Sequence, residues 1–451
     1  MLLVRTALFL GCAIGLMAQS DSAQDDAAPA SPDEAYSGPA ILSRGQTPGT
    51  QSVAPIAFRP YIGVSGDYTS GLVPVAVNSS GQIPLTDAYG VAVNLGAYTH
   101  RTGKHTTITL GYTANFQHYP KDSHIDDTNQ FLSLTIAHRF SRHVTFTLSN
   151  GAGIYSQNSF LPSTQGVLSP NYLQLPQNDI FDGRTIFLST AGDLTYYMTP
   201  RLSFNLGGEG NLVRRSSSAL YGVTGATAHG DVQYRFGRNS ILGADYRFSN
   251  FTYTKGFGGS DIHSVGLNYS AKVTRHVQVS MRVGGARVES LGLAQVQLDP
   301  AVAALLGESV SIQAAYSLHY VPDMSASLTD SFRHSHFGLT YSDGVSPGNG
   351  VYLASRREGG GASYSYTGIH YWNFAVNATY ARMNAIVQTL GAYTSYGAGA
   401  GVTRELGKGL HAVLRLDAGH YDVAGNSFLH TQYRASVGLF FSPGDVPLAL
   451  W

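Results

Sequence analysis

The stretch RLSFNLGGEGNL, residues 201–212, shows the pattern that decides the fold. Leu202, Phe204 and Leu206 alternate with small or polar residues. Successive side chains of a β-strand point to opposite faces of the sheet, so a period of two marks a strand with one apolar face. The stretch therefore predicts a strand that separates an apolar environment from a polar one.

The same alternation recurs from residue 58 to residue 441, in segments of roughly 10 to 14 residues. Strands in soluble proteins average about 5 to 6 residues, whereas a tilted strand needs about 9 to 11 to cross a bilayer. The length of the segments therefore favours strands that cross a membrane. Clear examples are residues 108–116, 132–136, 144–148, 265–273, 277–283, 312–320, 372–380 and 433–441.

The connections between these segments alternate between short and long. Tight turns are predicted at residues 101–104, 141–142, 199–200, 237–239, 274–275, 322–323, 369–370 and 407–409. Longer loops rich in Gly, Ser and Pro are predicted at 71–86, 120–127, 157–183, 215–222, 254–260, 289–309, 339–350, 386–392 and 422–429. Such a chain has about 18 strands, with a range of 16 to 20, and its short turns and long loops lie at opposite ends.

A sheet with one apolar face exposes unpaired edges in lipid unless it closes on itself. We therefore predict an all-β fold, a closed antiparallel transmembrane β-barrel with both termini on the periplasmic side. A soluble all-β array or propeller is the alternative, but its strands are shorter and its loop lengths do not alternate in this way.

The composition restricts the function classes. The chain of 451 residues has 28 Lys and Arg against 28 Asp and Glu, so it lacks the basic character of a nucleic-acid binder. Charged residues make up only 12%, and no apolar run reaches the length of about 18 residues that a membrane-spanning helix requires.

The N-terminal segments read as export and linker sequences. Residues 1–18 resemble a cleaved signal peptide, with Arg5 before an apolar core, and a lipoprotein site at Cys12 is the alternative. Residues 19–57 have the composition of a disordered periplasmic leader, too short for a folded plug. The barrel is expected at 58–442 and a C-terminal tail at 443–451.

On these patterns, residues 58–441 resemble a Gram-negative outer-membrane β-barrel of the porin-like type. The resemblance implies an outer-membrane location, lipid as surroundings, and insertion by the barrel-insertion machinery through the last strand. Phe441 or the terminal Trp451 would serve as the insertion signal. Aromatic residues are expected to form two interfacial girdles. The inner girdle is assigned to Phe140, Tyr196, Tyr234, Phe236, Tyr320, Tyr371 and Trp372, and the outer one to Tyr155, Tyr246, Phe248, Phe251 and Tyr253.

If the apolar parity faces lipid, the other parity lines the interior, because inward charges avoid a cost of about 2–4 kcal/mol for Arg or Lys at the bilayer midplane. One interpretation is a solvated polar wall. The other is a constriction in which arginines face carboxylates and select permeants by charge. The selectivity candidates are Asp193, Glu209, Arg235, Asp245, Arg247, Arg282, Arg415 and Asp417.

Other features carry less weight. Loop 157–183 is rich in apolar residues, which suits either a constriction loop or packing on the barrel rim. Residues 300–306 have a sequence typical of a short helix. His334 and His336 share a strand face, but two histidines alone are weak evidence for a metal, and no metal or cofactor is expected. Gly-rich runs lack the following helix that a phosphate site needs, and no GxSxG element is present, so we expect no enzyme.

The sequence therefore predicts a channel for passive diffusion of small hydrophilic solutes. The alternative is a non-conducting or plugged barrel that acts in exopolysaccharide export, surface assembly or adhesion. The oligomeric state, monomer or homo-oligomer, stays open at this stage.

Overall fold

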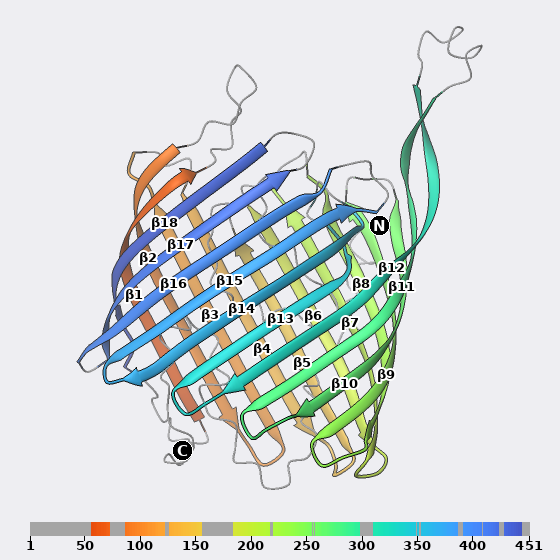
Figure 1. The fold of residues 1–451 in the computed structure, drawn as a ribbon, viewed down its shortest axis with the longest axis horizontal. Helices are drawn as coiled ribbons and strands as arrows, with labels where there is room; N and C mark the ends of the chain where they lie inside the picture. The colour runs from red at the N-terminus through yellow and green to blue at the C-terminus, as the bar shows by residue number, and fades with distance from the viewer. Residues whose placement is uncertain are drawn as a thin grey trace, which may run out of the picture.

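The structure is a computed structural model that describes residues 56–72, 86–121, 126–155, 184–216, 220–254, 256, 258–297, 310–348, 350, 353–386, 391–407, 409–423 and 428–443. Within these ranges the chain forms eighteen antiparallel strands, which are shown in Figure 1. Among the same residues no helix is long and apolar enough to cross a membrane.

The first nine strands are β1 (Ile56–Leu72), β2 (Thr86–Thr102), β3 (Thr106–His118), β4 (Asp127–Arg139), β5 (Val144–Tyr155), β6 (Thr185–Tyr197), β7 (Leu202–Arg215), β8 (Gly222–Arg235) and β9 (Ser240–Thr254). The other nine are β10 (Gly259–Lys272), β11 (Val277–Gln297), β12 (Val310–Ser331), β13 (Ser335–Ser346), β14 (Ser355–Ile369), β15 (Trp372–Ala385), β16 (Tyr393–Gly407), β17 (Leu410–Val423) and β18 (Phe428–Phe441).

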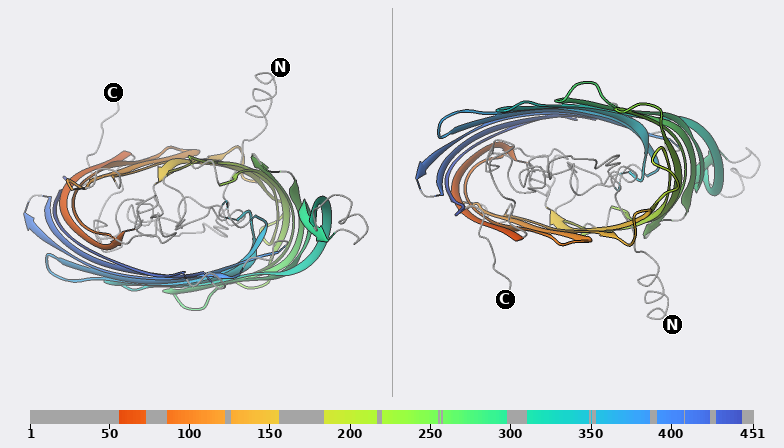
Figure 2. Two further views of the ribbon diagram at one scale, coloured as in Figure 1. Left: turned by 90° about the horizontal axis from the view of Figure 1, so that it is seen from above. Right: turned by 90° about the horizontal axis from the view of Figure 1, so that it is seen from below.

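Each strand pairs with its neighbours in sequence, and β1 pairs with β18, so the sheet closes into a barrel. The ring is oval, with β1 curving around one narrow end and β9 to β11 around the other (Figure 2). Closure removes the sheet edges that a bilayer would leave without hydrogen-bond partners. The predicted fold, an antiparallel closed β-barrel with 18 strands, is confirmed.

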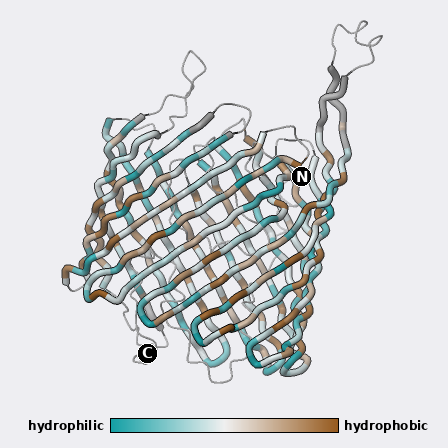
Figure 3. The backbone as a smooth tube through the Cα atoms, in the orientation of Figure 1, coloured by the Kyte–Doolittle hydropathy of each residue, from teal (hydrophilic) through white to brown (hydrophobic). Residues whose placement is uncertain are grey.

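The apolar side chains of the alternating pattern lie on the outer surface of the barrel. In β7, Phe204 and Leu206 are exposed, whereas Asn205 and Glu209 are buried on the inner side. Figure 3 shows the resulting alternation of hydrophobic and hydrophilic positions along the strands. A soluble protein rarely leaves so many large apolar side chains exposed over contiguous strands, so this surface suits lipid.

Seven of the eight predicted tight turns are confirmed, but the one at residues 322–323 is wrong. Pro322 and Asp323 lie inside β12, and the turn to β13 lies at residues 332–334. Pairing of β12 with β13 begins only at Met324, so Pro322 sits where β12 has no neighbour on that side. A residue without an N–H is tolerated at such an edge.

The strands β11 and β12 consequently extend further than the others and rise beyond the barrel as a long hairpin (Figure 1). Two long loops begin later than predicted for related reasons. Residues 289–297 continue β11, and residues 339–346 belong to β13, because each stretch still has a paired strand beside it.

The predicted aromatic girdles are partly wrong. Tyr155 of β5 and Phe251 and Tyr253 of β9 face the interior and are buried. Tyr246, also on β9, faces outward. Tyr320 is exposed, but it pairs with Arg287 and lies eleven residues from the end of β12, far from the inner turns. Nearness to a loop is not enough to assign a side chain to the lipid face, since parity decides the side of the wall.

Candidate functional site: the polar inner wall

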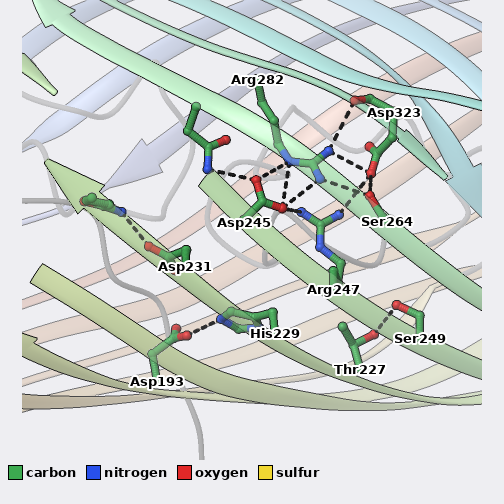
Figure 4. Close-up of polar contacts among 12 residues, drawn as sticks. Asp193, Thr227, His229, Asp231, Asp245, Arg247, Ser249, Ser264, Arg282 and Asp323 are labelled. Carbon is green, nitrogen blue, oxygen red and sulfur yellow. Dashed lines mark hydrogen bonds and ion pairs between the residues drawn. The ribbon is translucent and has the colours of Figure 1, made fainter. Parts of the chain in front are cut away.

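The inner wall from β6 to β12 carries a patch of charged side chains at mid-strand positions, and Figure 4 labels all of them except Glu209. We call these residues the central patch. They are Asp193, Glu209, His229, Asp231, Asp245, Arg247, Arg282 and Asp323.

Arg282 on β11 is the hub of the patch. Its Nε donates to Asp245 Oδ1 at 2.9 Å and its Nη2 donates to Asp245 Oδ2 at 2.8 Å, which is a bidentate contact across two strands. Its Nη1 lies 2.7 Å from Asp323 Oδ2 on β12. A guanidinium fork with five donors is the group best able to hold two carboxylates in fixed positions.

Glycines make room for this arginine. Asp245, Gly266, Gly284 and Asp323 lie in one row across β9 to β12. A Cβ added at Gly266 would come within 2.8 Å of the Arg282 guanidinium, so only glycine lets the guanidinium lie flat on the wall.

Arg247 on β9 completes a four-membered ring of alternating charges. Its Nη2 lies 3.9 Å from Asp245 Oδ2, and its Nη1 lies 3.7 Å from Asp323 Oδ2. Each carboxylate thus contacts both guanidinium groups. Because all four side chains are at most 16% exposed, the ring is held by charge-assisted contacts that bulk water does not fully screen.

A second contact of the central patch joins Asp193 on β6 to His229 on β8. The two side chains meet over Gly207 of the intervening strand β7, where a Cβ would collide with both of them. Asp193 also accepts a hydrogen bond of 3.1 Å from Asn205 Nδ2. Neighbouring Asp231 accepts one of 2.9 Å from Gln233 Nε2.

Glu209 differs from the other carboxylates of the central patch. Its side chain points inward from β7, is 5% exposed, and neither carboxylate oxygen has a hydrogen-bond partner among the described residues. The charged groups that act on it are Arg247, which attracts it, and Asp193, which repels it. The central patch holds five carboxyl groups against two guanidinium groups and His229, so its acidic groups outnumber its basic ones.

Strands β1, β17 and β18 carry a separate group of charges. Arg434 Nη2 on β18 lies 3.3 Å from Asp67 Oδ1 on β1. Arg415 Nε donates to Asp417 Oδ2 at 2.7 Å within β17. These ion pairs are six to nine strands away from Arg247 and Arg282 around the ring.

The structure brings together five of the predicted selectivity residues, namely Asp193, Glu209, Asp245, Arg247 and Arg282. The pairs at Asp245 are lateral contacts along one wall, so the arginines there do not face their carboxylates across the lumen. Arg415 and Asp417 lie on another wall, and Arg235 lies at the turn end of β8. The role of these eight residues in selectivity stays a prediction.

Three members of the central patch, His229, Asp231 and Asp323, are not among the predicted selectivity residues. Asp323 was assigned to a turn because it follows Pro322, and His229 was not singled out. The signal was present in the inward glycines, since Gly207 and Gly266 each mark a place where a neighbouring side chain crosses a strand.

A buried apolar cluster lies on the same inner face, nearer the long-loop end of the strands. It comprises Tyr155, Phe187, Val213, Val223, Phe251, Tyr253, Ile262, Ala286, Val288 and Val321. The inner wall is therefore layered, with an apolar layer between the central patch and the long-loop end.

No group of three or more His, Cys, Asp or Glu side chains is placed to hold a metal ion in the parts of the chain that the structure describes. His336 instead contacts the Ser331 hydroxyl through Nδ1 at 3.0 Å. The predictions for loop 157–183 and for a helix at 300–306 fall outside the described residues.

Comparisons with known proteins find similarity to solved structures alone. No family model matches the chain, and no curated protein matches it. Among solved structures, the Pseudomonas aeruginosa protein OccK5 (OpdH) matches with 14% identity and a TM-score of 0.39, covering 85% of this chain and 98% of that one.

Two further matches are of the same kind. Pseudomonas aeruginosa OccK2 (OpdF), solved in complex with glucuronate, has 12% identity and a TM-score of 0.41, covering 85% and 98% of the two chains. Acinetobacter baumannii OccAB4 has 11% identity and a TM-score of 0.38, covering 88% and 99%. The strand pairing of the chain itself shows the fold, a closed antiparallel barrel of 18 strands. Similarity this low transfers no solute and no residue role.

Proposed function

We propose that this protein is an outer-membrane channel through which small hydrophilic solutes diffuse passively. The observation that carries the proposal is the parity of the closed wall, in which apolar side chains face outward and hydrogen-bonding or charged side chains face inward. An inward polar wall is what a hydrated path needs, and barrels of 16 to 18 strands enclose an aqueous channel.

The proposal includes the cellular context. Residues 1–18 act as a cleaved signal peptide, residues 19–57 form a periplasmic leader, and the last strand with tail 443–451 is presented to the insertion machinery. In this account no residue is catalytic. The lumen side chains replace part of the hydration of the solute, and the sparse charges set its selectivity.

The charged groups of the central patch predict whether the channel prefers cations or anions. In the four-membered ring the two arginines offset Asp245 and Asp323, and His229 contacts Asp193, so the acidic groups without a basic contact among the described residues are Glu209 and Asp231. Uncompensated carboxylates raise the local concentration of cations and lower that of anions. We therefore expect the pore to prefer cations.

Planar-bilayer recordings of the refolded chain without residues 1–55 test the proposal. Stepwise conductance in neutral salt, with a reversal potential that reports cation preference across a salt gradient, is the expected result. Glu209→Gln should lower that preference. The control is Arg415→Gln, which removes a positive charge at the other end of the oval and should not lower it. Silent bilayers from correctly folded protein would contradict the channel and favour a plugged barrel.

A further inference from the structure

The tight turns form a rim of positive charge at one end of the barrel, along the lower edge of Figure 1. The eight turns comprise residues 103–105, 140–143, 198–201, 236–239, 273–276, 332–334, 370–371 and 408–409. Their sequences contain Lys or Arg in seven cases and His370 in the eighth, and no Asp or Glu in any. We call these eight turns the basic rim.

The cations of the basic rim are available for a partner. The side chains of Lys104, Arg142, Arg201, Arg238, Arg275 and Arg333 are all exposed, and none has an ion pair with another described residue. Strand ends beside the rim add Arg101, Arg139, Arg235, Lys272 and Arg404, against Asp330 and Glu405. The chain as a whole has no net charge, so this end of the molecule is a local concentration of positive charge.

The complementary charge lies in the segment that precedes β1. Residues 19–55 contain Asp21, Asp25, Asp26, Asp33 and Glu34 against a single base, Arg44. The acidic residues fall within fourteen positions, between 21 and 34. Such a run of like charge in a segment without apolar bulk is typical of an interaction tail.

The chain connects the two charge groups directly. Ile56, where β1 begins, pairs with Arg101, which is next to the turn at residues 103–105. Around the ring, the following turn belongs to β4 and β5 and carries Arg142. The acidic segment is therefore tethered beside the basic rim, at the Lys104 side of the oval.

The length of the tether allows contact. Twenty-one residues separate Glu34 from Ile56, and a flexible chain of that length has an end-to-end distance of about 25 Å. The turn between β2 and β3 lies within about 10 Å of β1 and the turn between β4 and β5 within about 20 Å, so both are within reach. A tether of this kind gives an effective concentration on the order of millimolar, enough for weak charge pairs to form.

We propose that the acidic segment 21–34 docks on the part of the basic rim formed by Arg101, Lys104 and Arg142. The attraction is screened by salt, since the Debye length is about 8 Å at physiological ionic strength and about 3 Å at 1 M. The docking holds the leader against the periplasmic mouth of the barrel. It does not rest on conductance, so it stands or falls separately from the channel proposal.

The only cysteine of the chain is Cys12, so the chain from residue 19 onward accepts specific labels without background. Spin labels at Ser31→Cys and His105→Cys report the distance from the leader to the near rim, and labels at Ser31→Cys and Asn239→Cys report the distance to the far rim. Double electron–electron resonance is measured on the chain from residue 19 in nanodiscs of zwitterionic lipid.

Docking predicts a short, narrow distance distribution to His105→Cys at low salt and a longer one to Asn239→Cys. Adding 1 M salt, or the substitutions Arg101→Gln, Lys104→Gln and Arg142→Gln together, should reduce the short-distance population by about half or more. The matched control Arg238→Gln, Arg275→Gln and Arg333→Gln removes the same charge from the far rim and should leave the distribution unchanged.

Two results would overturn the proposal. A broad distribution that is the same at low and high salt means that the leader does not dock. A narrow distribution that survives neutralisation of the near rim means that the leader binds another surface. Loss of the short distance only when anionic lipid is included would identify lipid headgroups as the stronger occupant of the rim, which also contradicts leader docking as the resting state.

Discussion

Replacing the hub of the central patch should affect both stability and selectivity. Arg282→Gln removes one charge that contacts Asp245 and Asp323 and leaves both carboxylates with the longer ion pairs to Arg247 and with one neutral hydrogen bond each, from Asn268 and Ser264. Breaking a buried ion pair by removing one partner costs about 3–5 kcal/mol. We expect a loss of that size in the free energy of unfolding, measured by urea titration of the protein in vesicles.

The control for this change is Arg415→Gln, which also removes one inward guanidinium. Among the described residues Arg415 contacts Asp417 on its own strand, and its side chain is 24% exposed. Asp417 is itself 6% exposed, so Arg415→Gln strands one buried carboxylate where Arg282→Gln strands two, and its loss of stability should be smaller. The variant Arg282→Gln with Asp323→Asn should recover part of the loss, because it removes one of the two stranded charges.

The effect on selectivity follows from Coulomb's law. One unit of charge at about 10 Å in water changes the energy of a monovalent ion by about 0.4 kcal/mol. Cations then become about twofold more concentrated and anions about twofold less, so the permeability ratio rises about fourfold in Arg282→Gln. Equal destabilisation by Arg282→Gln and Arg415→Gln, or a shift of Arg282→Gln toward anions, would refute the reasoning.

Three further outcomes test other parts of the account. Gly266→Ala places a Cβ against the Arg282 guanidinium and should cost about 1–3 kcal/mol of stability by overpacking. Its control is Gly66→Ala, which has no atom within 4 Å of the added Cβ and should cost less than about 1 kcal/mol. Equal costs in urea titration would contradict the role given to Gly266. Glu209→Gln removes a buried carboxylate without a hydrogen-bond partner among the described residues, so the stability of the protein should rise or stay the same. The cation preference should fall in reversal-potential measurements. A marked loss of stability would show that the charge of Glu209 is compensated. Phe441→Ala should reduce insertion by the purified insertion machinery in vesicles several-fold if Phe441 is the signal, and deletion of 443–451 should not; the reverse result would assign the signal to Trp451.

Period-two alternation predicted the strands and the face of each residue, because the side of a barrel wall that a residue faces is a local property of the strand. The number of strands followed from the alternating short and long connections. Parity also placed Asp193, Glu209, Asp245, Arg247 and Arg282 on the inner side. Contacts between strands are different. The row that joins Asp245 to Asp323 depends on the register of four strands, and a register is set by pairing that one strand's sequence does not contain.

The wrong predictions have the same origin. Pro322 was interpreted as a turn residue, whereas its tolerance inside β12 depends on where β13 stops pairing. Tyr155, Phe251 and Tyr253 were assigned to a lipid girdle from their nearness to loops, although Phe251 and Tyr253 share the parity of Asp245 and Arg247. Counting parity from those inward charges would have placed both β9 side chains correctly.

The most direct test of the central claim is single-channel conductance of the refolded barrel in planar bilayers, recorded without the leader and in a salt gradient. The account predicts steady conductance steps with a cation-preferring reversal potential, and a further shift toward cations in Arg282→Gln. Protein that is folded by circular dichroism but gives no conductance steps would contradict the claim that the polar inner wall lines a path for solutes.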